Sequence, residues 1–229
     1  MISTRSLVIS TAFVALSIPL IHAQDLSRYR QFELGMDLPT VAKQAGMNPA
    51  EAIVIYQRPA VIQELQWRLQ SSYSSSAQTD PVKEVLLGFC NGQLYRIVVT
   101  YDQDRTEGLT DEDMIEGISA KYGTPTMPVA KIISSSPSQA YSDSEKVIAR
   151  WEDPQYSLNL FRFSYQSTFG LLIFSKRLDA QAQVAIVEAI RLNKQEAPQR
   201  EIDRQKKEAD EKRAASQKVR PINRANFRP

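Results

Sequence analysis

A short pattern that occurs twice in the chain constrains its fold more than any other feature. Residues 35–49 and 108–125 each contain a polar helix start, apolar residues at helical spacing, then a glycine and a proline. Asp37 and Thr110 are N-cap residue types, whose side-chain oxygens accept hydrogen bonds from backbone N–H groups of the first helical turn. Glycine fits a left-handed helix C-cap, and proline prevents the helix from continuing. The two stop signals are Gly46 with Pro49 and Gly123 with Pro125.

Four strand-like segments follow each of these helices. The first set is Ala52–Gln57, Val61–Leu69, Val82–Cys90 and Gln93–Tyr101, and the second is Val129–Ser134, Lys146–Glu152, Tyr156–Phe163 and Thr168–Lys176. The sequence therefore predicts an α+β fold of two tandem units, residues 24–103 and 104–195. Each unit is a short helix followed by a four-stranded antiparallel sheet. Units of about 70 residues bury little core alone, so we expect them to pack together.

Turn chemistry and strand composition support this plan. Asn91-Gly92 separates two apolar runs, and both residue types tolerate the positive φ angles of a two-residue type I′ hairpin turn. In Tyr156–Phe163, Leu158 and Leu160 share one face while Phe161 shares the other with Phe163. A sheet covered on one side only alternates more cleanly. We therefore expect both sheet faces to be covered, either within the chain or by a partner protein.

The first 23 residues have the three parts of an export signal. Arg5 supplies the positive charge, Leu7–Ile21 is an apolar run of 15 residues, and Ala23 is a small residue at the cleavage position. An uncleaved anchor is the alternative, but a spanning helix needs about 20 residues. No cysteine is present for a lipoprotein anchor at this site. We expect a signal peptide at 1–23, no integral membrane segment after its removal, and a periplasmic or secreted protein.

The residue types that are missing exclude several chemistries. His22, the one histidine, lies in the predicted signal, so the mature chain lacks the usual base of Ser-His and Cys-His nucleophile pairs. The commonest transition-metal ligand is lost with it. Cys90 is the one cysteine, so no intramolecular disulfide forms. We expect Cys90 to be buried, the alternatives being a reactive thiol or a link between two copies.

Charge divides the chain into an acidic body and a basic tail. Residues 24–190 carry 15 Lys and Arg against 20 Asp and Glu, a net charge of −5. Residues 191–229 carry 12 against 6, a net charge of +6. We expect an apolar helix at Val184–Leu192 that ends at Pro198, then a charged helical or disordered tail at 196–229, disordered from residue 214. The candidate surface-binding residues of this tail are Lys206, Lys207, Lys212, Arg213, Lys218, Arg220, Arg224 and Arg228.

The repeated helix motif also carries a family resemblance. Gly35-Met36 with Val41, Gly46 and Pro49, and Gly108-Leu109-Thr110 with Ile115, Tyr122, Gly123 and Pro125, resemble the opening of SmpA/OmlA-type outer-membrane assembly domains. The tandem plan is similar to the beta-lactamase-inhibitor-protein fold. The resemblance covers roughly residues 32–179, and it implies protein binding in the envelope rather than catalysis. The chain lacks the lipoprotein cysteine of the first family and the disulfides of the second.

Acidic residues offer two further candidates. Residues 102–113 place oxygen ligands at positions 1, 3, 5, 9 and 12 of a calcium-loop frame. However, Glu107 occupies the glycine position and Asp113 replaces the bidentate Glu, so a polar strand-to-helix loop is the simpler interpretation. Glu152-Asp153 and Asp111 with Asp113 are paired carboxylates, and a glycosidase mechanism needs two such groups across a cleft.

Together these observations favour a non-enzymatic envelope protein that binds another protein. The first alternative is binding of anionic lipid, lipopolysaccharide or cell-wall polymer through the basic tail. The competing interpretation of the tail is that it only confers solubility. The second alternative is a carboxylate-dependent hydrolase. We expect no cofactor and no nucleic-acid partner, because the tail lacks interleaved aromatic residues for base stacking.

Overall fold

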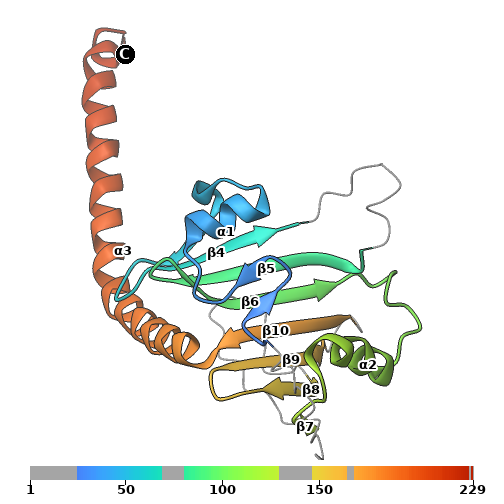
Figure 1. Ribbon diagram of the computed structural model, residues 1–229. Coiled ribbons are helices and arrows are strands. Elements are labelled where there is room, and N and C mark those ends of the chain that lie inside the picture. Colours follow the sequence, from blue (N-terminus) through green and yellow to red (C-terminus); the bar gives the residue numbers. More distant parts are fainter. Residues whose placement is uncertain (1–24, 69–79, 129–145, 164–167, 227, 229) are drawn as a thin grey trace, which may run out of the picture.

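The computed structural model describes residues 25–68, 80–128, 146–163, 168–226 and 228. These residues form an eight-stranded antiparallel sheet, a two-stranded hairpin and three α-helices, so the α+β class is confirmed (Figure 1). In chain order the elements are β1 (Arg28–Tyr29), β2 (Phe32–Glu33), α1 (Leu38–Ala45), a 3₁₀ turn (Pro49–Glu51), β3 (Ile53–Tyr56), β4 (Ile62–Trp67), β5 (Val82–Cys90), β6 (Gln93–Tyr101), α2 (Asp111–Tyr122), β7 (Met127–Pro128), β8 (Lys146–Glu152), β9 (Tyr156–Arg162), β10 (Phe169–Ser175) and α3 (Lys176–Asn226).

Strands β3 to β10 lie in one continuous sheet with the order β3-β4-β5-β6-β10-β9-β8-β7. Strands β3–β6 form one half of this sheet and strands β7–β10 form the other. The halves join where β6 pairs with β10, from Arg96 opposite Phe174 to Thr100 opposite Gly170. The sequence predicts one four-stranded sheet in each unit, whereas the structure joins the two sets of strands edge to edge in a single sheet. This arrangement pairs two strands that would otherwise be exposed edges.

Most strand bounds agree with the sequence prediction. Strands β5, β6 and β8 have the predicted bounds, and β3, β4, β9 and β10 differ by one or two residues at their ends. The β5–β6 turn has positive φ at both Asn91 (49°) and Gly92 (77°), as predicted. The predicted strand Val129–Ser134 lies outside the described residues, and β7 precedes it. The β1–β2 hairpin was not predicted, because its strands have only two residues each.

Helix capping places α1 and α2 where the repeated motif predicted them. Asp37 accepts a hydrogen bond from the Thr40 N–H at 2.7 Å, and Gly46 ends α1 in the left-handed conformation. Thr110 and Asp113 form a reciprocal capping box at α2. The predicted left-handed cap is wrong at Gly123, whose ψ is −160°. There the chain extends toward β7, and the Gly123 carbonyl accepts a hydrogen bond from the indole N–H of Trp151 in β8.

Two hydrophobic cores lie on opposite faces of the sheet. The larger core contains residues of the β1–β2 hairpin, α1 and α2, together with Phe89 and Leu94 of the sheet. The smaller core contains Cys90 and Tyr95 with residues of α3. Neighbouring residues of a strand point to opposite faces, which separates the two cores. The expected coverage of both faces within the chain is confirmed for these residues, and so is the burial of Cys90.

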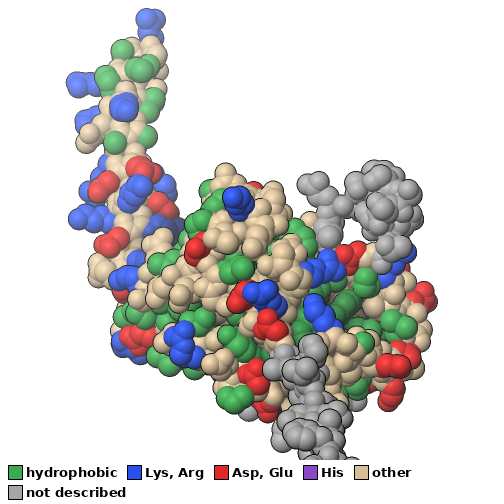
Figure 2. Space-filling model, in the orientation of Figure 1, with side chains coloured by type: hydrophobic (Ala, Val, Ile, Leu, Met, Phe, Trp, Pro, Cys, Tyr) green, Lys and Arg blue, Asp and Glu red, His purple; other side chains and the backbone are tan. Residues whose placement is uncertain are grey.

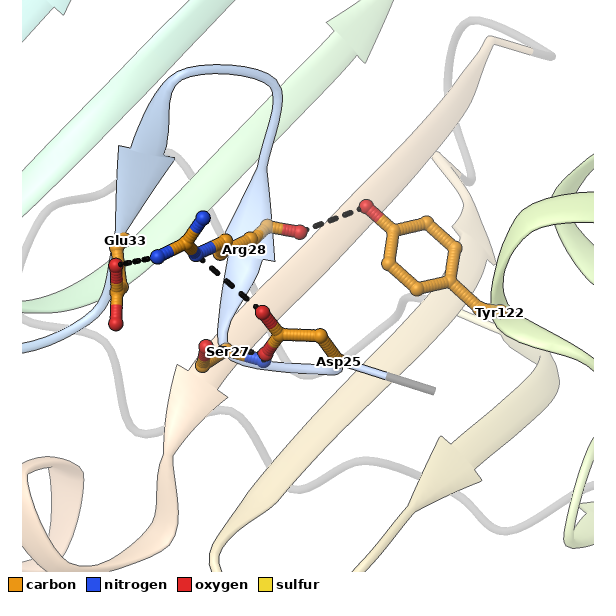
Figure 3. A network of polar contacts seen from close by, with 5 residues as sticks. All are labelled: Asp25, Ser27, Arg28, Glu33 and Tyr122. Carbon is orange, nitrogen blue, oxygen red and sulfur yellow. Dashed lines mark hydrogen bonds and ion pairs between the residues drawn. The ribbon is translucent and has the colours of Figure 1, made fainter. Parts of the chain in front are cut away.

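The β1–β2 hairpin is tied to α2 by the polar network in Figure 3. The Tyr122 hydroxyl donates a hydrogen bond to the Arg28 carbonyl at 2.8 Å. The Arg28 guanidinium in turn contacts Asp25 at 3.3 Å and Glu33 at 2.5 Å. Burial raises the pKa of the Tyr122 phenol above its ordinary value. The network therefore holds a neutral phenol between the N-terminal hairpin and α2.

Helix α3 overturns two predictions for the C-terminal region. It begins at Lys176, immediately after β10, and runs without a break to Asn226, with Pro198 and Pro221 inside it. Pro198 therefore does not end the helix, and residues 214–226 are helical rather than disordered. An internal proline removes one helical hydrogen bond and favours a bend. Figure 1 shows α3 bending where it leaves the body.

Candidate binding surfaces

The predicted basic residues lie on the part of α3 that projects from the body. We call residues 197–226 the arm; every one of them is exposed. At 1.5 Å per residue the arm extends about 45 Å. The helical members of the predicted set are Lys206, Lys207, Lys212, Arg213, Lys218, Arg220 and Arg224, and Arg228 follows the helix end. All eight are exposed, so the arm displays its charge to the surroundings.

Charge is distributed unevenly along the arm. Near its base, Arg204 pairs with Glu201 at 2.8 Å and with Glu208 at 2.7 Å. From residue 212 onward the chain has no Asp or Glu. Figure 2 shows this change, with red and blue side chains mixed in the lower arm and blue ones at its end. Spacings of seven and four residues place Arg213, Arg220 and Arg224 on one helical face.

The start of α3 is anchored by burial and by ion pairs. We call residues 176–192 the docked segment; its buried residues include Leu178, Ala182 and Ile186. Arg96 on β6 pairs with Asp179 at 3.0 Å, and both side chains are largely covered, with relative exposures of 11% and 21%. Covering this pair reduces the screening of its attraction by dissolved salt. The docked segment therefore fixes the direction in which the arm leaves the body.

A second surface lies at the sheet edge formed by β3. Among the described strands, β3 pairs only with β4. Its residues Ile53 and Val54 are 65% and 44% exposed. Beside it lies a pocket of about 350 Å³, here called the edge groove. The groove is lined by Val54, Ile55, Tyr56, Gln57 and Arg58 from the β3 side and by Ala189, Leu192, Asn193 and Arg200 from α3.

Two guanidinium groups share one carboxylate at the edge groove. Arg58 contacts Glu196 at 2.8 Å, and Arg200 contacts the same carboxylate at 3.3 Å. The hydrogen bond from Arg58 is the largest effect that lowers the pKa of the Glu196 carboxyl below its ordinary value. Arg200 also donates to the Asn193 side chain at 2.9 Å. This cluster has one more positive than negative charge, which favours an anionic group in the groove.

The acidic candidates from the sequence have local structural partners. Asp102 accepts hydrogen bonds from the backbone N–H groups of Asp104 and Arg105, and Asp111 pairs with Arg162 at 2.6 Å. Glu152 pairs with Lys176 at 3.0 Å. Asp153 accepts from two backbone N–H groups in the turn before β9. The described residues contain no group of three or more His, Cys, Asp or Glu that could hold a metal ion.

Two further properties bear on function. Burial raises the pKa of the Cys90 thiol, which disfavours the reactive thiolate. Among the helices in the described ranges, none combines the length and apolar character needed to cross a membrane.

The basic tail was predicted from its composition, whereas the edge groove was not predicted from the sequence. The apolar run Ile53-Val54-Ile55 without a charged residue was a signal for it, but only the fold shows that this run is at an edge.

Comparison with known proteins gives no assignment: no family model, curated protein or solved structure matches the chain. The surfaces themselves are therefore the basis for a functional proposal.

Proposed function

We propose that this chain is a non-enzymatic protein of the cell envelope that binds another protein, and that the sheet edge at β3 is the main binding surface. The observation that carries the proposal is the exposure of Ile53 and Val54 on β3, beside the edge groove. Apolar edge strands are normally protected by charge, proline or a covering element. An edge that retains two exposed apolar residues is typical of a surface that a partner covers.

The export signal and the duplicated plan support the envelope setting. The signal-peptide pattern at 1–23 favours a periplasmic or secreted mature protein. A helix followed by four strands occurs once in each half of the chain, at α1 with β3–β6 and at α2 with β7–β10. We infer that these are two tandem units related to SmpA/OmlA-type and beta-lactamase-inhibitor-like domains. Proteins of both kinds act by binding other proteins, in keeping with the proposal.

A second candidate function is attachment to an anionic envelope surface through the arm. The observation that favours it is the acid-free end of α3, where five Lys and Arg side chains are exposed between residues 212 and 226. Each basic residue near an anionic surface contributes about 1 kcal/mol, and the attraction decreases within a Debye length. This function would be sensitive to salt, whereas an apolar edge surface would be much less so.

Crosslinked capture from envelope extract tests both candidates. The bait is the purified protein, compared with a version that ends at Ala197 and so lacks the arm. We expect both baits to capture the same protein partner, because the β3 edge is present in each. Capture of lipid or wall polymer by the full chain alone, lost in high salt, would assign function to the arm instead. Absence of any crosslinked protein would contradict the main proposal.

A further inference from the structure

The backbone of β3 can accept another strand. Along an antiparallel strand, N–H and C=O groups point alternately to the two sides. Only one side of β3 is used by a described strand, β4. The four residues Ile53–Tyr56 include no lysine or proline, which commonly block edge pairing. Within the described residues, the side of β3 that faces away from β4 pairs with no strand, and the side chains of Ile53 and Val54 beside it are exposed.

A register irregularity divides β3 into two parts with different surroundings. It lies between Val54 and Tyr56. Ile55 and Tyr56 pack against the smaller core beneath α3, whereas Ile53 and Val54 stay exposed. Bulges often turn an edge away from new partners. Here Val54 and Tyr56 line the edge groove together with residues of α3, so the groove lies between the edge strand and the helix.

A groove between an edge strand and a helix suits an extended peptide. In strand addition, main-chain hydrogen bonds supply affinity and the groove selects side chains. The helix wall of the edge groove is formed by Ala189, Leu192 and Asn193, and Arg200 lies at the same surface. This wall therefore offers both apolar and polar side chains to a bound peptide. An extended segment can place its backbone beside β3 and its side chains against the helix wall at the same time.

The charge of the groove selects the side chain that enters it. Arg58 and Arg200 both contact Glu196, and their side chains are 64% and 56% exposed. Each guanidinium has five N–H donors, and one carboxylate cannot occupy those of both groups. A second carboxylate would find donors there and would balance the excess positive charge. Arginine is well suited to such paired carboxylate recognition.

We infer that the edge groove binds an extended segment of a partner protein, which pairs with β3 as an added strand and places an acidic side chain beside Arg58 and Arg200. This inference rests on the proposed protein-binding function and specifies its partner.

Selection from a display library of random peptides, with the purified protein as target, tests the inference. We expect the selected peptides to alternate apolar and polar residues and to share one Asp or Glu. Replacing that residue by Asn or Gln should weaken binding about tenfold to the protein but not to its Arg58→Gln, Arg200→Gln variant. Methylation of alternate peptide backbone nitrogens should abolish binding, because a methylated nitrogen cannot donate to β3.

Matched variants localise the site. Ile53→Lys with Val54→Lys should lower peptide affinity at least about tenfold, because it adds charge to the apolar edge. Val184→Lys with Val187→Lys is the control: these residues are 73% and 63% exposed on the docked segment but do not line the groove, so affinity should be unchanged. Circular dichroism checks that both double variants fold.

Three outcomes would overturn the inference: selected peptides without acidic residues, peptides that bind equally well when methylated, or peptides insensitive to the Ile53 and Val54 changes. Self-association of the protein that is lost in Ile53→Lys, Val54→Lys would assign the edge to a second copy and also overturn it. If the Ile53 and Val54 variant still captures a protein from envelope extract, the binding function holds while the edge groove does not. If the unchanged protein captures none, the binding function itself fails.

Discussion

The docked segment and the arm belong to one helix but are stabilised in different ways. The docked segment buries Leu178, Ala182 and Ile186 against the sheet and is joined to it by the Arg96–Asp179 pair. The arm has no buried residue and carries ion pairs three or four positions apart. Such pairs contribute only about 0.2–0.5 kcal/mol each. The comparison indicates that tertiary packing stabilises the first part, and local helical interactions the second.

This difference has a consequence for function. A helix held only by local interactions can unfold and refold without disturbing the rest of the protein. A partner or a surface that binds the arm would therefore act on an element independent of the core. The edge groove lies at the base of the arm, where Glu196 and Arg200 meet Arg58. Binding in the groove would instead be coupled to the body.

The largest expected effect comes from shortening an isoleucine in each part of the helix. Ile186 is 2% exposed and Ile222 is 59% exposed. Ile186→Ala should lower the free energy of unfolding by about 3 kcal/mol, because it leaves a cavity between α3 and the sheet. Ile222→Ala should change it by less than about 0.5 kcal/mol. Urea unfolding followed by tryptophan fluorescence measures both, and equal effects would remove the distinction between the two parts.

Alkaline pH should lower the free energy of unfolding of the body and leave the helicity of the arm unchanged. Burial raises the pKa of Tyr95 to about 12 and also raises those of Tyr101 and Tyr122. The unfolded value is about 10. The stability due to the neutral phenols is therefore complete below pH 10 and is lost as the pH rises through the folded values, by about 2–3 kcal/mol for Tyr95.

A phenolate absorbance titration, paired with unfolding measurements at each pH, checks this prediction. The arm has no tyrosine, so its local helicity should not follow the phenolate signal. Tyrosines that all titrate near pH 10 in the folded protein would contradict it.

Removing the carboxylate of Asp179 should produce the next largest effect. Asp179→Ala removes the carboxylate that pairs with the covered Arg96 guanidinium. We expect a loss of about 2 kcal/mol, below the range for fully buried pairs because Asp179 retains some solvent contact. Hydrogen exchange should show weaker protection in the docked segment. Glu201→Ala, which removes a carboxylate from the arm, is the matched control and should leave the stability of the body unchanged.

The smallest effect on the body is expected from Pro198→Ala. Proline inside a helix costs about 3 kcal/mol relative to alanine, so the substitution should stabilise the helix locally where the arm begins. Protection from hydrogen exchange should increase around residue 198, with no change in the global unfolding midpoint. A shift of that midpoint would show that the arm and the body unfold as one unit.

Local chemistry explains why much of the fold could be predicted. Asp37 and Thr110 cap helices through side-chain hydrogen bonds that span only three residues. The Asn91-Gly92 turn depends on two residues that tolerate positive φ. Strand bounds followed the apolar runs, so β5, β6 and β8 were predicted to the residue. The exposed basic residues of the arm followed from composition alone.

One failed prediction misjudged a local balance of helix propensities, and another depended on interactions distant in sequence. Pro198 was expected to end a helix, but strong helix-forming sequences on both sides allow α3 to continue with a bend. The left-handed cap at Gly123 was wrong because the chain there extends toward β7, beside the tryptophan of β8. Gly170 has a tertiary role: a Cβ atom there would lie 2.3 Å from the Phe161 ring on β9. No local pattern encodes such a contact.

By itself, the sequence determined the elements and the charge of this protein, because caps, turns and hydrophobic alternation act between residues close along the chain. Only the tertiary structure decided that the two sets of strands share one sheet, which strand lies at its edge, and that α3 leaves the body beside that edge. Those outcomes depend on which surfaces bury each other, such as Leu178 and Ile186 against Tyr95. The edge groove combines β3 and α3 residues more than 130 positions apart, such as Val54 and Ala189.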